Sequence, residues 1–386
     1  MQALWRYDDG DVVRYEMRAG TKLRTAHLNR DSVGRVVEAT IDGGRHAFAY
    51  DIAGQLALAD TPAGAFEFGY DANGRLTREV STAHAAQYEY DAAGQLAACV
   101  VADGPVTRYE YDDAGRRIRE AGADLDRTYR WDEGGRLTEV VTSADGEDPR
   151  STRVVVDAFG ELAELDGTAM LWDTAHPLQP LAWDGRNAVV GEGAPWALAG
   201  EAGTEWLAPD WQGTVGEAAR DPWGAPLGAV AAAGASGVRL GFRGEIEFGT
   251  DTWLRHRVYQ PGSRAFLQPD ALPPMPGSAV AANPYHYAAN NAIGLADPLG
   301  WHPISEKELN AIRDRVGDRS ILDRGLNLAK EVREGALHAV KVAGKWAYEN
   351  ADDIALGLSV GALLLSPGGW AIAIGVGALA FSGAGA

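Results

Sequence analysis

The chain has 386 residues and a net charge of −19, because 35 Lys and Arg side chains stand against 54 Asp and Glu. This length suggests two to three domains, and the acidity disfavours a protein that binds nucleic acid. The single cysteine, Cys99, excludes a disulfide framework and a thiolate metal cluster. We expect no metal or cofactor. The 48 glycines exceed the usual share and suggest the tight turns of an all-β repeat fold.

The start of the chain shows no targeting signal. Residues 1–9 contain neither the basic stretch nor the apolar core of a signal peptide. We therefore expect either export by a dedicated machine, to the outside or the cell surface, or a chain that is a piece of something longer.

A repeat of about twenty residues follows, in which Asp is followed three positions later by Gly. An aromatic residue precedes most copies, as in Tyr70-Asp71-Ala-Asn-Gly74-Arg75-Leu76 and Trp131-Asp132-Glu-Gly-Gly135. The aspartates of the seven copies are Asp31, Asp51, Asp71, Asp91, Asp112, Asp132 and Asp157. Such a period is typical of a repeat architecture.

Each copy predicts a β-hairpin. The Asp side chain can accept hydrogen bonds from backbone N–H groups ahead of it, and Gly supplies the positive φ of a tight turn. The flanking residues alternate between apolar and polar, as in Tyr88-Glu-Tyr90, which indicates half-buried strands. Stacked hairpins would form one long sheet. We therefore interpret these Asp and Tyr residues as turn and packing elements, without a catalytic role.

These repeats resemble the YD repeats of the Rhs family of bacterial polymorphic toxins, which are related to the C component of insecticidal Tc toxins. The resemblance implies a mainly β fold, in which the repeats wind into a shell around a C-terminal toxic segment. It assigns residues 1–165 to the repeats and residues 166–241 to a degenerate repeat region. Seven copies are fewer than such a shell usually uses, so we expect a partial shell. A small α-helical C-terminal segment is expected to follow it.

Residues 242–301 resemble the Rhs repeat-associated core domain. The matching stretches run from Phe242 to Glu245 and from Trp253 to Asp270, and the signature Asp297-Pro-Leu-Gly300-Trp301 ends the domain. In the family, this domain cuts its own chain just after that signature.

The resemblance therefore implies aspartic-type autoproteolysis, the only enzymatic activity that we expect. Two carboxylates brought close together cannot both ionise easily, so one keeps a proton and the other can activate water. On this interpretation Asp270 is the base and Asp297 its partner, with Arg257 or Arg264 tuning their charge. The cut would fall between Trp301 and His302.

Two departures from the family pattern leave an alternative open. The first signature continues as Asp270-Ala, where the family has Asp-Pro, and Trp301 stands in place of the usual Leu. The two aspartates could therefore serve only as turn caps in an uncleaved chain.

The last 85 positions have a different composition. Residues 302–351 begin with the capping box Ser305-Glu-Lys-Glu308 and continue with helical apolar spacing, which predicts a helical segment. Residues 352–386 are uncharged from Ile354 onward and are divided by Pro367-Gly-Gly, which predicts an apolar helical hairpin able to enter a membrane.

The leading hypothesis is therefore a toxin delivery protein that carries its own C-terminal segment as cargo and releases it after Trp301. It would act in competition between bacteria or against a host, with a chaperone, an immunity protein and a secretion machine as partners. The alternatives are a structural or adhesive surface protein that is not cleaved, and a pore-forming effector that acts through residues 352–386.

Overall fold

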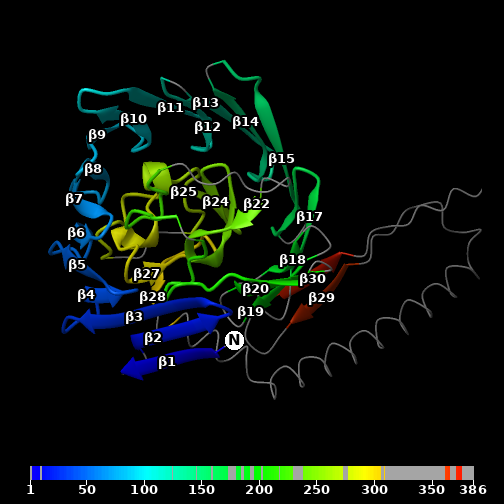
Figure 1. Ribbon diagram of the computed structural model, residues 1–386. Helices are drawn as coiled ribbons and strands as arrows, with labels where there is room; N and C mark the ends of the chain where they lie inside the picture. Colours follow the sequence, from blue (N-terminus) through cyan, green and yellow to red (C-terminus); the bar gives the residue numbers. More distant parts are fainter. Residues whose placement is uncertain are drawn as a thin grey trace, which may run out of the picture. The chain divides into compact units, whose positions relative to one another are not determined.

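Figure 1 shows the computed structural model of the chain. The residues that it describes are 2–8, 11–123, 125–144, 146–157, 160–172, 180–183, 187–191, 195–200, 203–216, 218–228, 238–272, 277–305, 308, 361–365 and 371–375. The chain divides into two compact units, Met1–Asp318 and Arg319–Ala386, and each is considered by itself.

The first unit begins with a long antiparallel meander in which each strand pairs with the next one along the chain. Its strands are β1 (Gln2–Asp8), β2 (Asp11–Ala19), β3 (Lys22–Arg30), β4 (Val36–Ile41), β5 (Gly44–Tyr50), β6 (Leu56–Thr61), β7 (Gly64–Tyr70), β8 (Leu76–Ser81), β9 (Ala85–Tyr90), β10 (Leu96–Val101), β11 (Val106–Tyr111), β12 (Arg117–Ala121), β13 (Leu125–Trp131), β14 (Leu137–Ala144), β15 (Arg150–Val156), β16 (Leu162–Leu165), β17 (Thr168–Trp172), β18 (Pro180–Trp183), β19 (Asn187–Gly191), β20 (Pro195–Gly200) and β21 (Gly203–Trp206). The predicted mainly β repeat fold is confirmed.

The repeat turns have the predicted geometry. In the copy at Asp71, the N–H of Gly74 donates to the Asp71 carbonyl over 3.0 Å, and Gly74 has a φ of +71°. The Asp71 Oδ1 atom accepts the N–H groups of Asn73 and Arg75 at 2.9 and 3.0 Å. Local hydrogen bonds therefore explain why Asp and Gly keep their spacing in every copy.

In several repeats the aromatic residue joins the repeat to the one before. The Tyr70 hydroxyl donates to the Leu56 carbonyl and the Tyr90 hydroxyl to the Leu76 carbonyl, both at 2.8 Å. Trp131 makes the same link with its Nε1–H, which donates to the Arg117 carbonyl. The structure therefore confirms that these aromatic residues have a packing role.

Residues 238–305 form a compact core domain that packs against the repeat sheet. Its elements are β22 (Val238–Leu240), the 3-10 turns η1 (Phe242–Gly244), η2 (Pro261–Ser263) and η3 (Ala288–Asn290), and the strands β23 (Ile246–Phe248), β24 (Asp251–Leu254), β25 (Arg257–Gln260), β26 (Ala265–Phe266), β27 (Leu295–Ala296) and β28 (Ile304–Ser305). In Figure 1 the strands from β3 to β15 curve around this domain. Buried aromatic residues of the domain join one apolar cluster with Phe66 and Phe68 of β7.

The stretch between the meander and the core domain contains two more copies of the repeat turn. Asp210 and Asp221 each accept the N–H groups two and four residues ahead, at 2.8 to 3.0 Å. Each is followed three positions later by a glycine whose N–H donates back to the Asp carbonyl. The repeat turn therefore continues up to the core domain.

The C-terminal part differs from the sequence prediction. Gly361–Leu365 (β29) and Ala371–Gly375 (β30) pair as antiparallel strands, so the predicted helical hairpin is wrong at these ten residues. Pro367-Gly-Gly separates the two runs, and such residues break a helix but suit a turn. The remainder of 352–386 lies outside the described residues.

The predicted capping box at the start of 302–351 is present. The N–H of Glu308 donates to the Ser305 hydroxyl over 3.2 Å, and the N–H of Ser305 donates to the Glu308 carboxylate over 2.7 Å. Residues 309–351, where the helical segment is expected, lie outside the described residues. Within the described parts of the chain, no helix is long and apolar enough to span a membrane.

Candidate functional site

The core domain brings the two predicted catalytic carboxylates to one arginine. Asp270 follows β26 and Asp297 follows β27, so the two are far apart along the chain. The Arg257 Nη2 atom lies 3.1 Å from the Asp270 Oδ2 atom and 2.8 Å from the Asp297 Oδ2 atom. The Arg257 and Asp297 side chains are almost fully buried, whereas 15 % of the Asp270 side chain is exposed. The structure thus joins three of the predicted site residues.

Arg257 is also held by groups other than these carboxylates. Its Nε–H donates to the Gly300 carbonyl, and its Nη1 atom donates to the Pro284 carbonyl over 3.3 Å. Its guanidinium carbon lies 3.7 Å from the centre of the Phe266 ring. Burial lowers the Arg257 pKa, and the two carboxylates act in the opposite direction. This arginine is therefore fixed between the carboxylates and the loop that ends at Trp301.

Asp297 sits in a turn like those of the repeats. Its Oδ1 atom accepts the N–H of Trp301 at 2.9 Å, and its carbonyl accepts the N–H of Gly300 at 3.2 Å. Burial raises the pKa of the Asp297 carboxyl, although Arg257 and the Trp301 N–H oppose this shift. The turn therefore contains a carboxyl group that holds a proton more readily than an ordinary aspartate does.

The predicted cleavage point lies in the loop between β27 and β28. These strands pair Leu295 with Ser305 and Ala296 with Ile304. The Trp301 ring stacks on the His256 ring, with 4.2 Å between centroids and 18° between planes. His302, on the other side of the predicted cut, is exposed. The Trp301–His302 peptide bond thus lies between a side chain that is packed on His256 and a side chain that is exposed to water.

Arg264 is not part of this cluster. Its Nη2 and Nε atoms donate to the Glu79 carboxylate of β8 at 2.7 and 3.1 Å, and its Nη1 atom lies 2.7 Å from the Asp221 Oδ2 atom. The expectation that Arg264 tunes the Asp270–Asp297 pair is therefore wrong. The arginine instead joins the core domain to the repeat sheet through carboxylates that lie far away in the sequence.

Two histidines near the cluster were not predicted from the sequence. His256 precedes Arg257 and stacks on Trp301. Burial and the nearby charge of Arg257 lower the pKa of His286 to about 4, so its ring is neutral. His256 is the sequence neighbour of the predicted site residue Arg257, and this adjacency is the signal that could have pointed to it. His286 is brought near Arg257 only by the fold.

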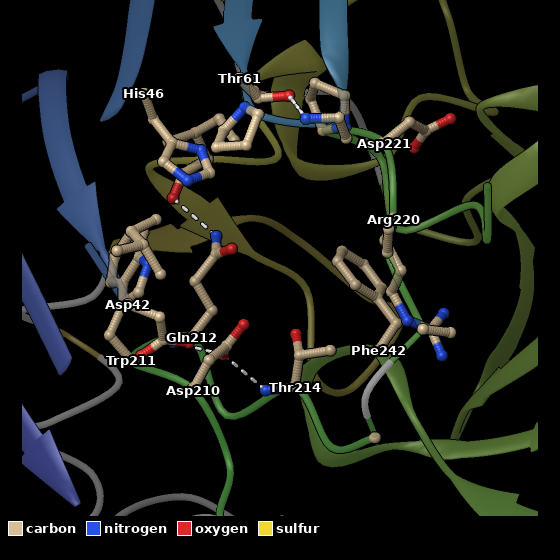
Figure 2. A pocket seen from close by; sticks show the side chains of 18 of the residues that line it. Asp42, His46, Thr61, Asp210, Trp211, Gln212, Thr214, Arg220, Asp221 and Phe242 are labelled. Carbon is tan, nitrogen blue, oxygen red and sulfur yellow. Dashed lines mark hydrogen bonds between the residues drawn. The ribbon is translucent and has the colours of Figure 1, made fainter. Parts of the chain in front are cut away.

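A separate cavity of about 400 Å³ lies between strands β3–β6 and the turns at 210–222. Figure 2 shows Asp42 and His46 on the repeat side of this cavity, and Asp210, Gln212 and Arg220 on the other side. Several of its charged groups are engaged within the protein. They form the pairs Arg24–Asp42, Arg220–Glu247 and Arg264–Asp221. No group of three potential metal ligands occurs among the described residues.

The fold and the turns define a β-repeat protein with a core domain packed on its sheet. The sequence profile named RHS Repeat matches residues 70–101, which include the turns at Asp71 and Asp91. The chain therefore contains repeats of the Rhs/YD type. No curated protein sequence matches it.

Several solved structures are similar to the chain at low identity. The structure of TcdB2-TccC3-Cdc42 is 15 % identical with a TM-score of 0.34, and the match covers 79 % of this chain and 24 % of that one. The Tc holotoxin pore of Photorhabdus luminescens is 14 % identical with a TM-score of 0.36, and the match covers 76 % and 23 %. The chain thus spans about a quarter of the length of these toxin chains. The Rhs/YD character of the repeats rests on the sequence match at residues 70–101.

Proposed function

We propose that residues 242–301 form a peptidase that cuts its own chain once, between Trp301 and His302. One observation carries this proposal: Asp270 and Asp297 share the Nη2 atom of Arg257, whose Nε–H donates to the carbonyl of Gly300, one residue before Trp301. Two carboxylates and a fixed backbone segment thus occupy one small volume. An intramolecular substrate is already positioned, so a modest catalyst is sufficient.

The environments of the two carboxylates support different roles. Asp270 is the more exposed and acts as the base, which takes a proton from a water molecule. The water oxygen bonds to the carbonyl carbon of Trp301, and the bond from that carbon to the His302 nitrogen breaks. Asp297, whose pKa is raised by burial, gives its proton to the leaving nitrogen. The products are a carboxyl group on Trp301 and a free amine on His302.

Intact mass spectrometry of the purified full chain tests this proposal. The wild type should give two masses, for residues 1–301 and 302–386, and the variants Asp270→Asn and Asp297→Asn should each give one. A wild type with one mass, or a cut that persists in both variants, would overturn the proposal.

We further propose that the repeat sheet carries the segment after Trp301 as cargo of a toxin delivery protein. The RHS repeat match at residues 70–101 supports this class of function. The export machine, a chaperone, an immunity protein and membrane action by residues 352–386 are expectations of the same proposal. Leakage of dye-loaded liposomes caused by the released 302–386 fragment, and not by the uncleaved Asp297→Asn chain, would support the membrane role. No leakage with either would contradict it.

A second candidate function is a structural or adhesive surface protein that is not cleaved. It is favoured by the turn role of both aspartates. The Asp297 Oδ1 atom accepts the Trp301 N–H, and the Asp270 Oδ1 atom accepts the Leu272 N–H at 2.9 Å. In that case the two carboxylates would act as turn caps, as Asp71 does in its repeat. The mass measurement separates the candidates, because this one predicts a single mass for the wild type.

A further inference from the structure

Three consecutive residues, from the turn before β25 to the first residue of β25, attach the cleavage loop to the rest of the unit. Arg255 pairs with Glu161 of the repeat sheet, and its guanidinium carbon lies 3.8 Å from the Trp172 ring centre. The N–H of His256 donates to the Leu299 carbonyl over 3.3 Å. Arg257 binds the Gly300 carbonyl and the two carboxylates. The backbone of the loop is therefore fixed up to the residue before Trp301.

The side chain of Trp301 is held separately, by the ring of His256. The two rings lie nearly parallel, 4.2 Å apart. The imidazole also approaches the repeat turn at Gly160, where a Cβ added to the glycine would lie 3.3 Å from the His256 Cε1 atom. The imidazole therefore has a limited space in which to move. Trp301 stacks on a ring that the repeat sheet helps to hold.

The charge state of His256 suits this contact. Partial burial lowers its pKa, and the neighbouring charges of Arg255 and Arg257 lower it further. A neutral imidazole needs no counter-ion and offers a flat face to an indole ring. A small aliphatic residue at 301 would cover less of that face.

We propose that His256 is a positioning residue for self-cleavage and that it selects an aromatic side chain at position 301. This inference rests on the proposed cut between Trp301 and His302. By holding the Trp301 ring, His256 fixes the residue that supplies the reacting carbonyl. The fold therefore orients that carbonyl before the reaction begins, and no further entropy is lost in orienting it during the reaction.

A cycle of four full-length chains tests the inference: wild type, His256→Ala, Trp301→Leu and the double variant. Each is made by cell-free translation, and the appearance of the 302–386 fragment is followed after a pulse of label. Loss of one ring stack is expected to slow the cut of the wild type by about three- to tenfold. In the Trp301→Leu chain, the same histidine change should alter the rate less than about twofold. His256→Phe, which keeps a flat ring, should restore most of the wild-type rate.

Other outcomes would overturn the inference in distinguishable ways. If His256→Ala cuts as fast as the wild type, the contact does not position the bond. If His256→Ala slows the cut equally in the wild-type chain and in the Trp301→Leu chain, His256 has a general structural role and does not select the residue at 301. If the wild type is not cut at all, the proposed peptidase fails and this inference with it. Hydrogen exchange of the peptide 299–303 in the Asp297→Asn chain then still reports whether His256 orders the loop.

Discussion

The same Asp-x-x-Gly turn occurs in the repeat sheet and in the core domain, and its aspartate behaves differently in the two regions. At Asp71, burial acts to raise the carboxyl pKa, but hydrogen bonds from the backbone and side chain of Arg75 outweigh it and lower the pKa. At Asp297, burial prevails and the pKa is raised. Asp71 pairs with an arginine four residues ahead, whereas Asp297 pairs with Arg257 on another strand. The surroundings of a turn thus decide whether its aspartate stays ionised or keeps a proton more readily.

The ion pairs of the two regions differ in how deeply their side chains are buried. In the sheet, Arg78 and Glu67 form a cross-strand pair in which both side chains are more than half exposed. Where the core domain meets the sheet, Arg264 and its partners Glu79 of β8 and Asp221 are almost fully buried. Exposed pairs contribute little to stability, but a buried pair that loses one partner leaves an uncompensated charge. The contact between the core domain and the sheet therefore includes a long-range buried ion pair, whereas the repeat turns are held by local hydrogen bonds.

The largest expected effect on stability is at Arg264. Arg264→Met leaves the Glu79 and Asp221 carboxylates without their shared arginine and should lower the free energy of unfolding by about 3–5 kcal/mol. Arg78→Met, the exposed control, should cost less than about 1 kcal/mol. Urea unfolding in the Asp297→Asn background, where no cut intervenes, measures both. Equal losses would contradict the contrast between buried and exposed pairs.

A smaller effect is expected where the core domain touches a repeat turn. A Cβ at Gly74 would lie 2.8 Å from the Ala279 carbonyl oxygen, whereas one at Gly43 would meet nothing within 4 Å. Both glycines have positive φ values, so each alanine costs about 1–2 kcal/mol in backbone strain. Gly74→Ala should cost clearly more than Gly43→Ala in the same unfolding measurement. Equal losses of unfolding free energy in the two variants would mean that the core domain does not pack closely against the Gly74 turn.

The proposed cleavage should depend on pH. The mechanism needs Asp297 protonated, and its raised pKa extends the range in which it is protonated to higher pH. Above that pKa the protonated fraction falls as pH rises, so the rate should fall by up to about tenfold per pH unit. Cell-free chains chased at several pH values give the profile. A rate that increases with pH in this range would exclude Asp297 as the acid.

The smallest effect is expected from single hydrogen bonds. Tyr70→Phe removes the bond to the Leu56 carbonyl within the sheet, and Tyr285→Phe removes the bond from the core domain to the Gly115 carbonyl. Both bonds measure 2.8 Å, and each variant should lose about 1 kcal/mol. Urea unfolding shows whether the two losses match. No loss at Tyr70 would contradict the linking role of the repeat aromatics.

The sequence predicted what local chemistry determines. The repeat turns follow from Asp and Gly spacing, and the Ser305–Glu308 capping box follows from two side chains three residues apart. The meeting of Asp270, Asp297 and Arg257 was implied by resemblance to a family, because no local spacing brings such distant residues together.

The errors concern interactions that depend on the whole fold. Arg264 pairs with Glu79, which lies 185 positions away in the sequence. Nothing near either residue in the sequence indicates that pair. The stacking of His256 on Trp301 likewise needs the folded loop. At 361–365 and 371–375 the apolar composition, the small residues and the Pro-Gly-Gly break predict helices, but the segments form strands. Apolar composition does not distinguish a helix from a strand in short segments.

The most direct measurement is the intact mass of three full-length chains: the wild type, Asp297→Asn and Asp91→Asn. Asp91 caps the same kind of turn in the sheet, where its Oδ1 atom accepts the N–H groups of Ala93 and Gln95, so it controls for loss of a turn aspartate. We predict fragments 1–301 and 302–386 from the wild type and from Asp91→Asn, and one uncut mass from Asp297→Asn. An uncut wild type, or a cut Asp297→Asn chain, would contradict the claim that the core domain is a self-cleaving peptidase.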